Sequence, residues 1–119
     1  MITFKKLLER AKSERIAVHT PTEEQAIALL EALDKKGYEW RTGTKLTAKT
    51  YYKNHKQNTC YNFDFDLFGE KLGNKVLYCS LDCYQELNFT IIEFSEIDFT
   101  DKKNPENLQK LYVYQRKVK

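Results

Sequence analysis

The segment TPTEEQAIALLEALDKKGYEW, residues 20–40, constrains the fold of this chain more than any other part of the sequence. Thr20 is a favoured helix N-cap, Pro21 suits the first helical position, and Glu23 can close a capping box with Thr20. Four apolar residues then recur at helical spacing and predict a buried stripe: Ala26, Leu29, Leu30 and Leu33. Gly37 follows as a typical helix stop, so the segment predicts one amphipathic helix and its end.

Segments on either side of this helix have the patterns of strands. Residues 38–40 are expected to begin a strand that runs back beside residues 15–19. Residues 59–68 alternate aromatic and polar side chains, which is the period of a half-buried strand. A glycine-containing turn at 69–74 then leads to a partner strand at 75–80, so this region predicts a hairpin.

The other expected elements complete an α+β pattern. They are a first helix capped by Thr3 over residues 3–14, a helical turn at 80–88, a strand at 89–94, a helical turn at 105–108 and a terminal strand at 111–118. Residues 41–59 are expected to form a long loop with a short strand or turn inside it. We therefore expect a single small α+β domain over residues 1–119, with two helices on one face of a mixed or antiparallel sheet of five to six strands.

The cysteines and the apolar runs predict a soluble, cytoplasmic protein. Cys60, Cys79 and Cys83 give an odd count, and no apolar leader precedes them. A secreted disulfide framework is therefore not expected, and the three cysteines are interpreted as core or strand residues. The sequence also lacks a run of about 20 apolar residues, the length that a membrane-spanning helix needs.

The segment 41–60 is strongly basic, with five Lys or Arg residues and no acidic residue. Its cations alternate with aromatic residues, and the set considered for binding is Trp40, Arg41, Lys45, Lys49, Tyr51, Tyr52 and Lys53. Because cations bind phosphate and aromatic rings contact bases, a phosphate-bearing ligand fits this pattern. Two other interpretations stay open: a protein-binding surface anchored by its aromatic residues and Arg41, and a solvated loop pinned to the sheet by its tyrosines.

Residues 61–100 carry the opposite charge, with eight acidic and two basic residues. Asp64 and Asp66 alternate with aromatic residues and are expected on the same outward face of their strand. Carboxylates spaced on a rigid sheet can imitate nucleic-acid phosphates and occupy a basic groove. Asp64 and Asp66 therefore form a second candidate contact set, beside the simpler interpretation of a solvated sheet face.

No pattern in the sequence predicts catalysis. His55 and the three cysteines have the spacing H-x4-C-x18-C-x3-C, which lacks the C-x2-C pair of common zinc sites. His19 and His55 are the only imidazoles that could serve a cysteine nucleophile, and no Ser-His-Asp, G-x-S-x-G or glycine-rich phosphate-loop pattern is present. We therefore assign no catalytic and no metal-binding residue, and we expect no cofactor.

The order of the segments TPTEEQAIALLEALDKKGYEW, NTCY and TIIEFSEIDF resembles a group of small hypothetical proteins from phages and prophages of Gram-positive bacteria. The likeness covers residues 15–99 and includes the capped helix ending in G-Y-x-W, a variable loop, a T-C-Y strand and an I-I-E-F segment. These motifs are structural rather than catalytic. The resemblance implies an accessory protein of a mobile element, acting against host defence in the host-cell cytoplasm.

Two mechanisms of such proteins fit the sequence. The first is an anti-CRISPR-like inhibitor that binds a host defence effector, such as a CRISPR nuclease, through the acidic sheet face or the basic loop. The alternative is similar to the Thoeris anti-defence sponges, which sequester a cyclic nucleotide or ADP-ribose-type signal in an oligomer. A direct nucleic-acid binder is a third hypothesis, and it is disfavoured because residues 61–100 would repel phosphate.

Overall fold

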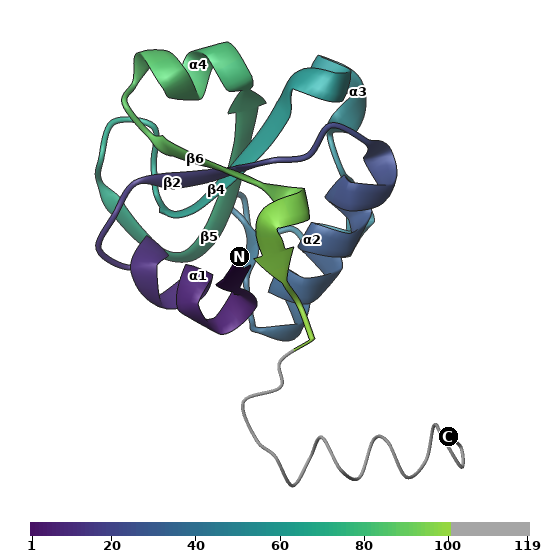
Figure 1. Cartoon of the computed structure of the whole chain (residues 1–119), viewed down its shortest axis with the longest axis horizontal. Coiled ribbons are helices and arrows are strands. Elements are labelled where there is room, and N and C mark those ends of the chain that lie inside the picture. The colour runs from purple at the N-terminus through teal and green to yellow at the C-terminus, as the bar shows by residue number, and fades with distance from the viewer. Residues whose placement is uncertain (101–119) are drawn as a thin grey trace, which may run out of the picture.

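The computed structural model describes residues 1–100, which form a five-stranded sheet with helices packed around it (Figure 1). The elements in chain order are β1 (Ile2–Thr3), α1 (Phe4–Ala11), β2 (Ile16–His19), α2 (Glu23–Lys35), β3 (Glu39–Trp40), α3 (Tyr52–His55), β4 (Thr59–Phe65), β5 (Lys71–Ser80), α4 (Leu81–Glu86), β6 (Thr90–Glu93) and β7 (Ile97–Asp98). Short 3-10 turns lie at Leu46–Ala48, Lys56–Asn58 and Phe94–Glu96. The helical turn predicted at 105–108 and the strand predicted at 111–118 lie outside the described residues.

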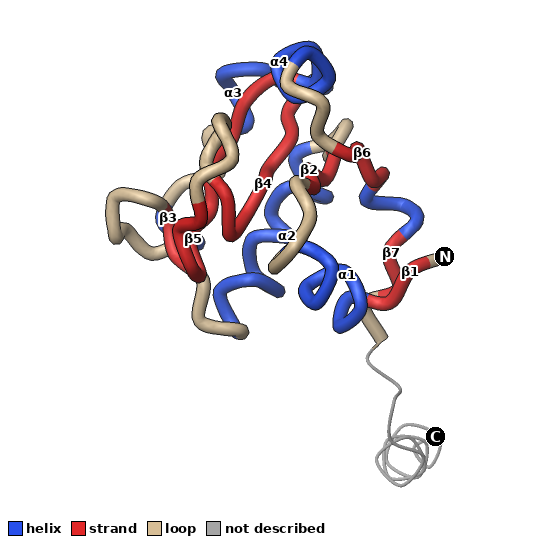
Figure 2. The backbone as a smooth tube through the Cα atoms, turned by 90° about the vertical axis from the view of Figure 1, so that its left-hand side faces the viewer, coloured by secondary structure: helices blue, strands red, loops and turns tan. Residues whose placement is uncertain are grey.

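The sheet confirms the α+β prediction and is mixed. Its strand order is β3-β5-β4-β2-β6. The central strand β4 runs antiparallel to β2 and β5, whereas the outer pairs β3–β5 and β2–β6 are parallel. β1 and β7 form a separate parallel pair. Figure 2 shows β3 and β5 on one side of the molecule and β6, β7 and β1 on the other.

The helix α2 forms where its apolar stripe predicts it, but it begins two residues later than the predicted cap. Thr22 is the N-cap: its side chain accepts from the Gln25 N–H, and the Gln25 side chain accepts from the Thr22 N–H. Thr20 is instead buried, and its N–H donates to the Thr59 carbonyl over 3.0 Å. Gly37 ends the helix with a φ of +92°, a conformation that glycine adopts at little cost. In the described part of the chain, no helix has the length and apolar character that crossing a bilayer requires.

The main core lies between the sheet and the helices α1 and α2. Each strand contributes alternate residues to it, among them Val18, Tyr61, Phe63, Val76 and Ile92, and the helices contribute Leu7, Leu29, Leu30 and Leu33. A second, smaller cluster lies on the opposite face, where α4 places Tyr84 against Ala17, Cys60 and Phe89. The prediction of two helices on one face therefore holds for α1 and α2, and α4 covers part of the other face.

The strand β4 is buried along its whole length, so the predicted half-buried alternation was wrong there. Its polar residues find partners inside the protein rather than in solvent. Asn62 accepts a hydrogen bond from the Tyr84 hydroxyl, and its amide donates to the Phe65 carbonyl. Asp64 accepts from the Tyr38 hydroxyl over 2.9 Å, and it lies at a bulge with a φ of +71°. Burial without these partners would be costly, so β4 depends on the two tyrosines.

The strand β3 lies at a different place in the sheet from the predicted one. It does not run beside β2 but forms the opposite edge of the sheet, where Trp40 is in register with Val76 of β5. The helix α2 crosses the sheet before β3 begins, so the chain returns at the far edge and runs parallel to β5. This placement puts the start of the basic segment beside β5.

The β4–β5 turn is tighter than the glycine pattern predicts. It spans residues 66–70, and β5 begins already at Lys71. Asp66 is buried and accepts hydrogen bonds from the backbone N–H groups of Phe68 and Glu70, over 2.9 and 2.8 Å. The backbone bond from Glu70 is the main reason that the pKa of Asp66 lies below its ordinary value. The carboxylate thus belongs to the turn and not to an outward acidic face.

Removing the Tyr38 hydroxyl tests the internal pairing of β4. Tyr38→Phe leaves the buried Asp64 carboxylate without this donor and should lower the free energy of unfolding by about 1–3 kcal/mol. Asp64→Asn is the matched control, because asparagine tolerates a positive φ and keeps an oxygen that can accept the bond. Urea unfolding followed by Trp40 fluorescence measures both variants. A loss for Asp64→Asn as large as that for Tyr38→Phe would contradict the assigned role of the hydroxyl.

The pKa of Asp66 predicts a pH-dependent stability. Because folding lowers this pKa, the ionised carboxylate stabilises the folded state above its ordinary pKa of 3.8, and that contribution is lost as the pH falls through the lower folded-state value. Asp66→Asn keeps an oxygen for both N–H groups but removes the charge. The variant should therefore be less stable than the wild type at neutral pH, and the difference should close between about pH 5 and pH 2. A difference that is constant over this range, measured by urea unfolding, would contradict the prediction.

Candidate functional site

The basic segment follows a compact course along the sheet edge and does not form an open loop. After β3 the chain turns sharply, with the Gly43 N–H donating to the Trp40 carbonyl over 2.7 Å and Lys45 bridging back to Glu39. Leu46 is fully buried against α2, and α3 with the following 3-10 turn then leads into β4. The predicted long loop therefore contains two 3-10 turns and one short helix.

Three aromatic rings form a cluster where this segment meets β5. The Tyr51 ring stacks on the Tyr78 ring with centroids 4.5 Å apart and an interplanar angle of 7°. Trp40 meets the edge of each, with centroids 4.8 Å from Tyr51 and 6.1 Å from Tyr78. Trp40 is buried, and its indole N–H donates to the Lys49 carbonyl over 3.2 Å. The cluster fixes the course of residues 49–51 over the end of β3.

A pocket of about 220 Å³ opens beside these rings. Its lining residues are Trp40, Arg41, Thr42, Tyr51, Val76, Leu77 and Tyr78. The pocket therefore lies at the junction between the end of β3, the turn that follows it and the continuing strand β5. Its walls are mainly apolar, and Arg41 supplies a cation at its rim.

Tyr52, the other tyrosine of the predicted set, and Tyr61 of β4 both hold the basic segment in place. The Tyr52 hydroxyl donates to the Pro21 carbonyl, which joins α3 to the start of α2. The Tyr61 hydroxyl donates to the Thr50 carbonyl from within the core. The interpretation of a loop pinned to the sheet by its tyrosines therefore fits Tyr51, which stacks on Tyr78 of β5 and also lines the pocket, whereas Tyr52 bonds to the segment before α2.

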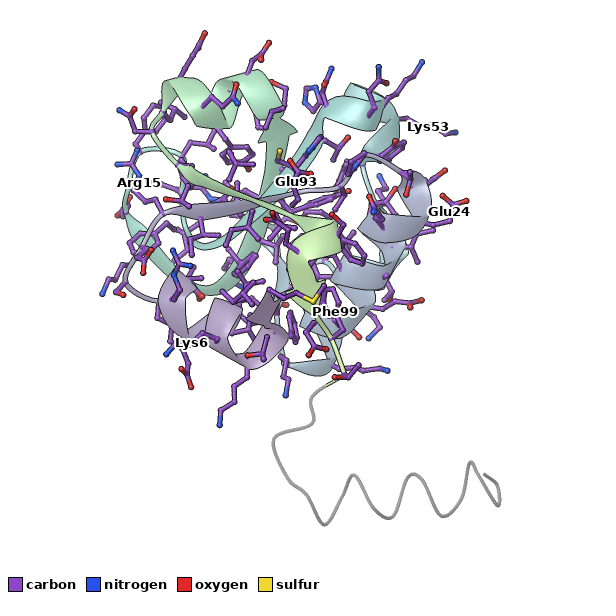
Figure 3. All side chains as sticks on the ribbon, viewed as in Figure 1. Lys6, Arg15, Glu24, Lys53, Glu93 and Phe99 are labelled. Carbon is purple, nitrogen blue, oxygen red and sulfur yellow. The ribbon has the colours of Figure 1, made fainter. Side chains whose placement is uncertain are left out.

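Exposed cations lie at the pocket and on the segment that follows it. Arg41, Lys49 and Lys53 are exposed, and within residues 1–100 none of the three forms a salt bridge. The Lys49 ammonium lies 5.7 Å from the centre of the Tyr51 ring, and Lys53 projects outward from α3 (Figure 3). Lys45 is different, because its ammonium pairs with Asp34 of α2 over 3.1 Å.

We define the cationic aromatic surface as Trp40, Arg41, Lys49, Tyr51, Lys53 and Tyr78. Four of the residues that we predicted for binding meet here directly: Trp40, Arg41, Lys49 and Tyr51. Lys53 lies nearby on α3, while Lys45 and Tyr52 have structural partners elsewhere.

The acidic residues of the predicted set are not part of a surface. Asp64 and Asp66 have exposed fractions of 5% and 8%, and their oxygens serve Tyr38 and the β4–β5 turn. Arg41 acts on Asp66 only as a weak electrostatic contribution that lowers the pKa of Asp66. The structure thus places the two aspartates away from solvent, which removes the physical basis of the acidic contact face.

A second polar arrangement lies on the other side of the sheet, around His19. Its Nδ1 lies 2.9 Å from a Glu93 carboxylate oxygen, and its Nε2 lies 2.8 Å from the Gln57 carbonyl oxygen. The two contacts place the ring between β2, β6 and the turn before β4. Because both ring nitrogens have partners, His19 contributes to the structure here.

Cys60 and Cys83 do not offer an activated thiolate. Cys60 is buried in register with Cys79, and burial raises the pKa of the Cys60 thiol to about 12. Burial also raises the pKa of Cys83, on α4, to about 11. Among residues 1–100 there is no group of three or more His, Cys, Asp or Glu residues placed to hold a metal ion.

Sequence reasoning missed the part of the site that β5 supplies. Val76, Leu77 and Tyr78 were interpreted only as the return strand of a hairpin, yet they form one wall of the pocket. Their pattern gives no sign of a site, because a short run of apolar residues is equally typical of any buried strand. Only the pairing of β3 with β5 brings Tyr78 to Trp40 and Tyr51.

Comparison with known proteins identifies no relative of this chain. No protein-family model, curated protein or solved structure matches the chain.

The raised thiol pKa values predict slow alkylation. At pH 8, a thiol with a pKa near 11 carries about 100-fold less thiolate than one with the ordinary value of 9.0. Because a more basic thiolate is also a stronger nucleophile, Cys83 should react with iodoacetamide about tenfold more slowly than a cysteine in a short peptide. Cys60 should react more slowly still, because it is also buried. Peptide mass spectrometry after timed alkylation measures each site. Peptide-like rates at Cys83 would contradict the raised pKa of its thiol.

Proposed function

We propose that this protein is a non-catalytic, phage-type anti-defence protein that inhibits a host defence effector by direct protein binding in the host-cell cytoplasm. The contact surface is the cationic aromatic surface at the β3 edge of the sheet. The observation that carries the proposal is that Arg41 lines an aromatic pocket, that Lys49 lies over its Tyr51 ring and that Lys53 is exposed on α3, with no salt bridge to any of the three within residues 1–100. The anti-defence context comes from the resemblance of residues 15–99 to small phage and prophage proteins.

This combination has the character of a protein interface. Aromatic residues and arginine are over-represented among the residues that dominate binding energy. Cations at the rim of such an anchor increase the rate of encounter with an acidic partner surface and help to select it. With Asp64 and Asp66 buried, the basic segment is the one of the two predicted contact sets that reaches solvent. The expected partner surface is therefore acidic.

The geometry favours a protein partner over the nucleotide alternative. Small-molecule sites commonly have volumes of about 300–1,000 Å³, whereas this pocket has about 220 Å³. The Tyr51 and Tyr78 rings also stack directly on each other, so a nucleotide base cannot insert between them. A pocket of this size suits one large side chain of a partner. An oligomeric nucleotide sponge and a nucleic-acid binder remain the outcomes that a test must separate from protein binding.

Charge reversal of the surface tests the proposal. The triple variant Arg41→Glu, Lys49→Glu, Lys53→Glu should reduce plating of a phage that depends on this protein at least tenfold on a defence-bearing host, and the effector nuclease should no longer co-purify. The matched control is Lys5→Glu, Lys6→Glu, Lys12→Glu, because these exposed lysines lie on or next to α1, and Lys6 projects from the opposite end of the molecule to Lys53 (Figure 3).

The control changes the net charge by the same amount but leaves the proposed surface intact. It should therefore retain full protection and still co-purify with the effector. Equal behaviour of the two triple variants would overturn the proposed surface. A thermal shift with cyclic nucleotides or ADP-ribose, lost in the first variant alone, would favour the sponge instead. Steeply salt-dependent DNA retention would favour nucleic-acid binding.

A further inference from the structure

The strand β5 extends beyond its outer neighbour. β3 has two residues, and it pairs only with Lys75 and Val76. On its inner side β5 pairs with β4 as far as Ser80. Within residues 1–100, no strand pairs with the outer edge of residues 77–80. The sheet therefore has an open edge beside the pocket.

The hydrogen-bond alternation fixes which backbone groups face this edge. The Arg41 N–H donates to the Val76 carbonyl over 3.2 Å, so the backbone groups of Val76 point outward, towards β3. Groups two residues apart on a strand point to the same side, so the N–H and C=O of Tyr78 also point outward. The pairing on the other side of β4 gives the same result. The Thr20 N–H donates to the Thr59 carbonyl, so the backbone groups of Thr59 and Tyr61 point towards β2 and those of Cys60 and Asn62 point towards β5. Cys60 and Asn62 are in register with Cys79 and Leu77, so the backbone groups of Cys79 and Leu77 point inward and those of Tyr78 point outward.

The chain leaves the edge open because it turns away after Arg41. The turn at 41–43 folds residues 44 and 45 back along the outside of β3 instead of continuing beside β5. The pocket occupies the vacated position, with Leu77 and Tyr78 of β5 on one side and Arg41 and Thr42 on the other. Tyr78 lies at the centre of this arrangement, since its ring lines the pocket and its backbone groups face the open edge.

We propose that an extended acidic segment of the partner adds as a further strand to β5 at Tyr78 and inserts one large apolar side chain into the pocket. This inference rests on the proposed function and specifies how the same surface binds. Strand addition supplies affinity through main-chain hydrogen bonds, and pockets for alternate side chains supply specificity. The acidic character follows from charge complementarity, because Arg41, Lys49 and Lys53 are exposed and lack salt bridges within the described residues.

A synthetic peptide, acetyl-Glu-Val-Glu-Phe-Glu-Val-Glu-amide, is the probe for this binding mode. On titration into the ¹⁵N-labelled full-length protein at low salt, it should shift the amide signals of residues 76–80 and 41–42 and should slow hydrogen exchange of the Tyr78 amide at least tenfold at saturation. Two controls are a peptide with Lys in place of each Glu, and a peptide with N-methyl groups on Phe and both Val residues, which removes alternate donors. Both should bind at least tenfold more weakly than the probe.

The protein variants distinguish this inference from the proposed function. Arg41→Glu with Lys49→Glu should weaken peptide binding at least tenfold, and Lys5→Glu with Lys12→Glu should leave it unchanged. Unaltered exchange of the Tyr78 amide with the peptide, or equal binding of the N-methylated copy, would overturn strand addition. If the charge-reversed triple variant still loses the effector in that case, the surface binds a protein in another way and the proposed function stands. If AMP shifts the same signals and the peptide does not, the site takes a nucleotide.

Discussion

The burial of β4 on both faces is the constraint on which the other features depend. The strand lies at the centre of the sheet, and the helices α1 and α2 cover one face while α4 covers part of the other. A strand in this position cannot send its polar side chains to water. Tyr84 and Tyr38 therefore act as internal partners for Asn62 and Asp64, and each tyrosine comes from a different element. These bonds join the helix α4 and the segment before β3 to the central strand.

The proposed binding surface follows from the same topology. β5 must match β4 over most of its length to complete the sheet, whereas β3 is short because the chain turns away to bury Leu46 against α2. Within residues 1–100, the difference in length leaves part of one sheet edge without a neighbouring strand. Natural proteins commonly protect such edges with charged residues, especially lysine. Here the nearby cations can serve that purpose in the free protein and can also select an acidic partner.

Local patterns in the sequence predicted most elements but not their partners. The predicted cap, Thr20 with Glu23, lies two residues too early: Thr22 with Gln25 caps the helix, because Thr20 continues the backbone pairing with Thr59. Alternation in β4 predicted exposed aspartates, and it failed because covering elements on both faces and a bulge at Asp64 override the simple period. The parallel pairing of β3 with β5 joins residues far apart in the chain, and no local signal specifies it. For this reason Trp40, Arg41 and Tyr51 were found from sequence, whereas Tyr78 was not.

The backbone of Tyr51 has a consequence for how this surface meets a partner. Its φ of +58° lies in the left-handed region, which a residue with a bulky side chain rarely adopts. Such a conformation costs about 1–3 kcal/mol and persists only where the surroundings hold it. The surroundings here are the Tyr78 and Trp40 rings, so the ring that walls the pocket is already in position before any contact is made. The side-chain entropy of Tyr51 is therefore lost when the protein folds and not when a partner binds. Binding then needs less ordering, and more of the contact energy contributes to affinity.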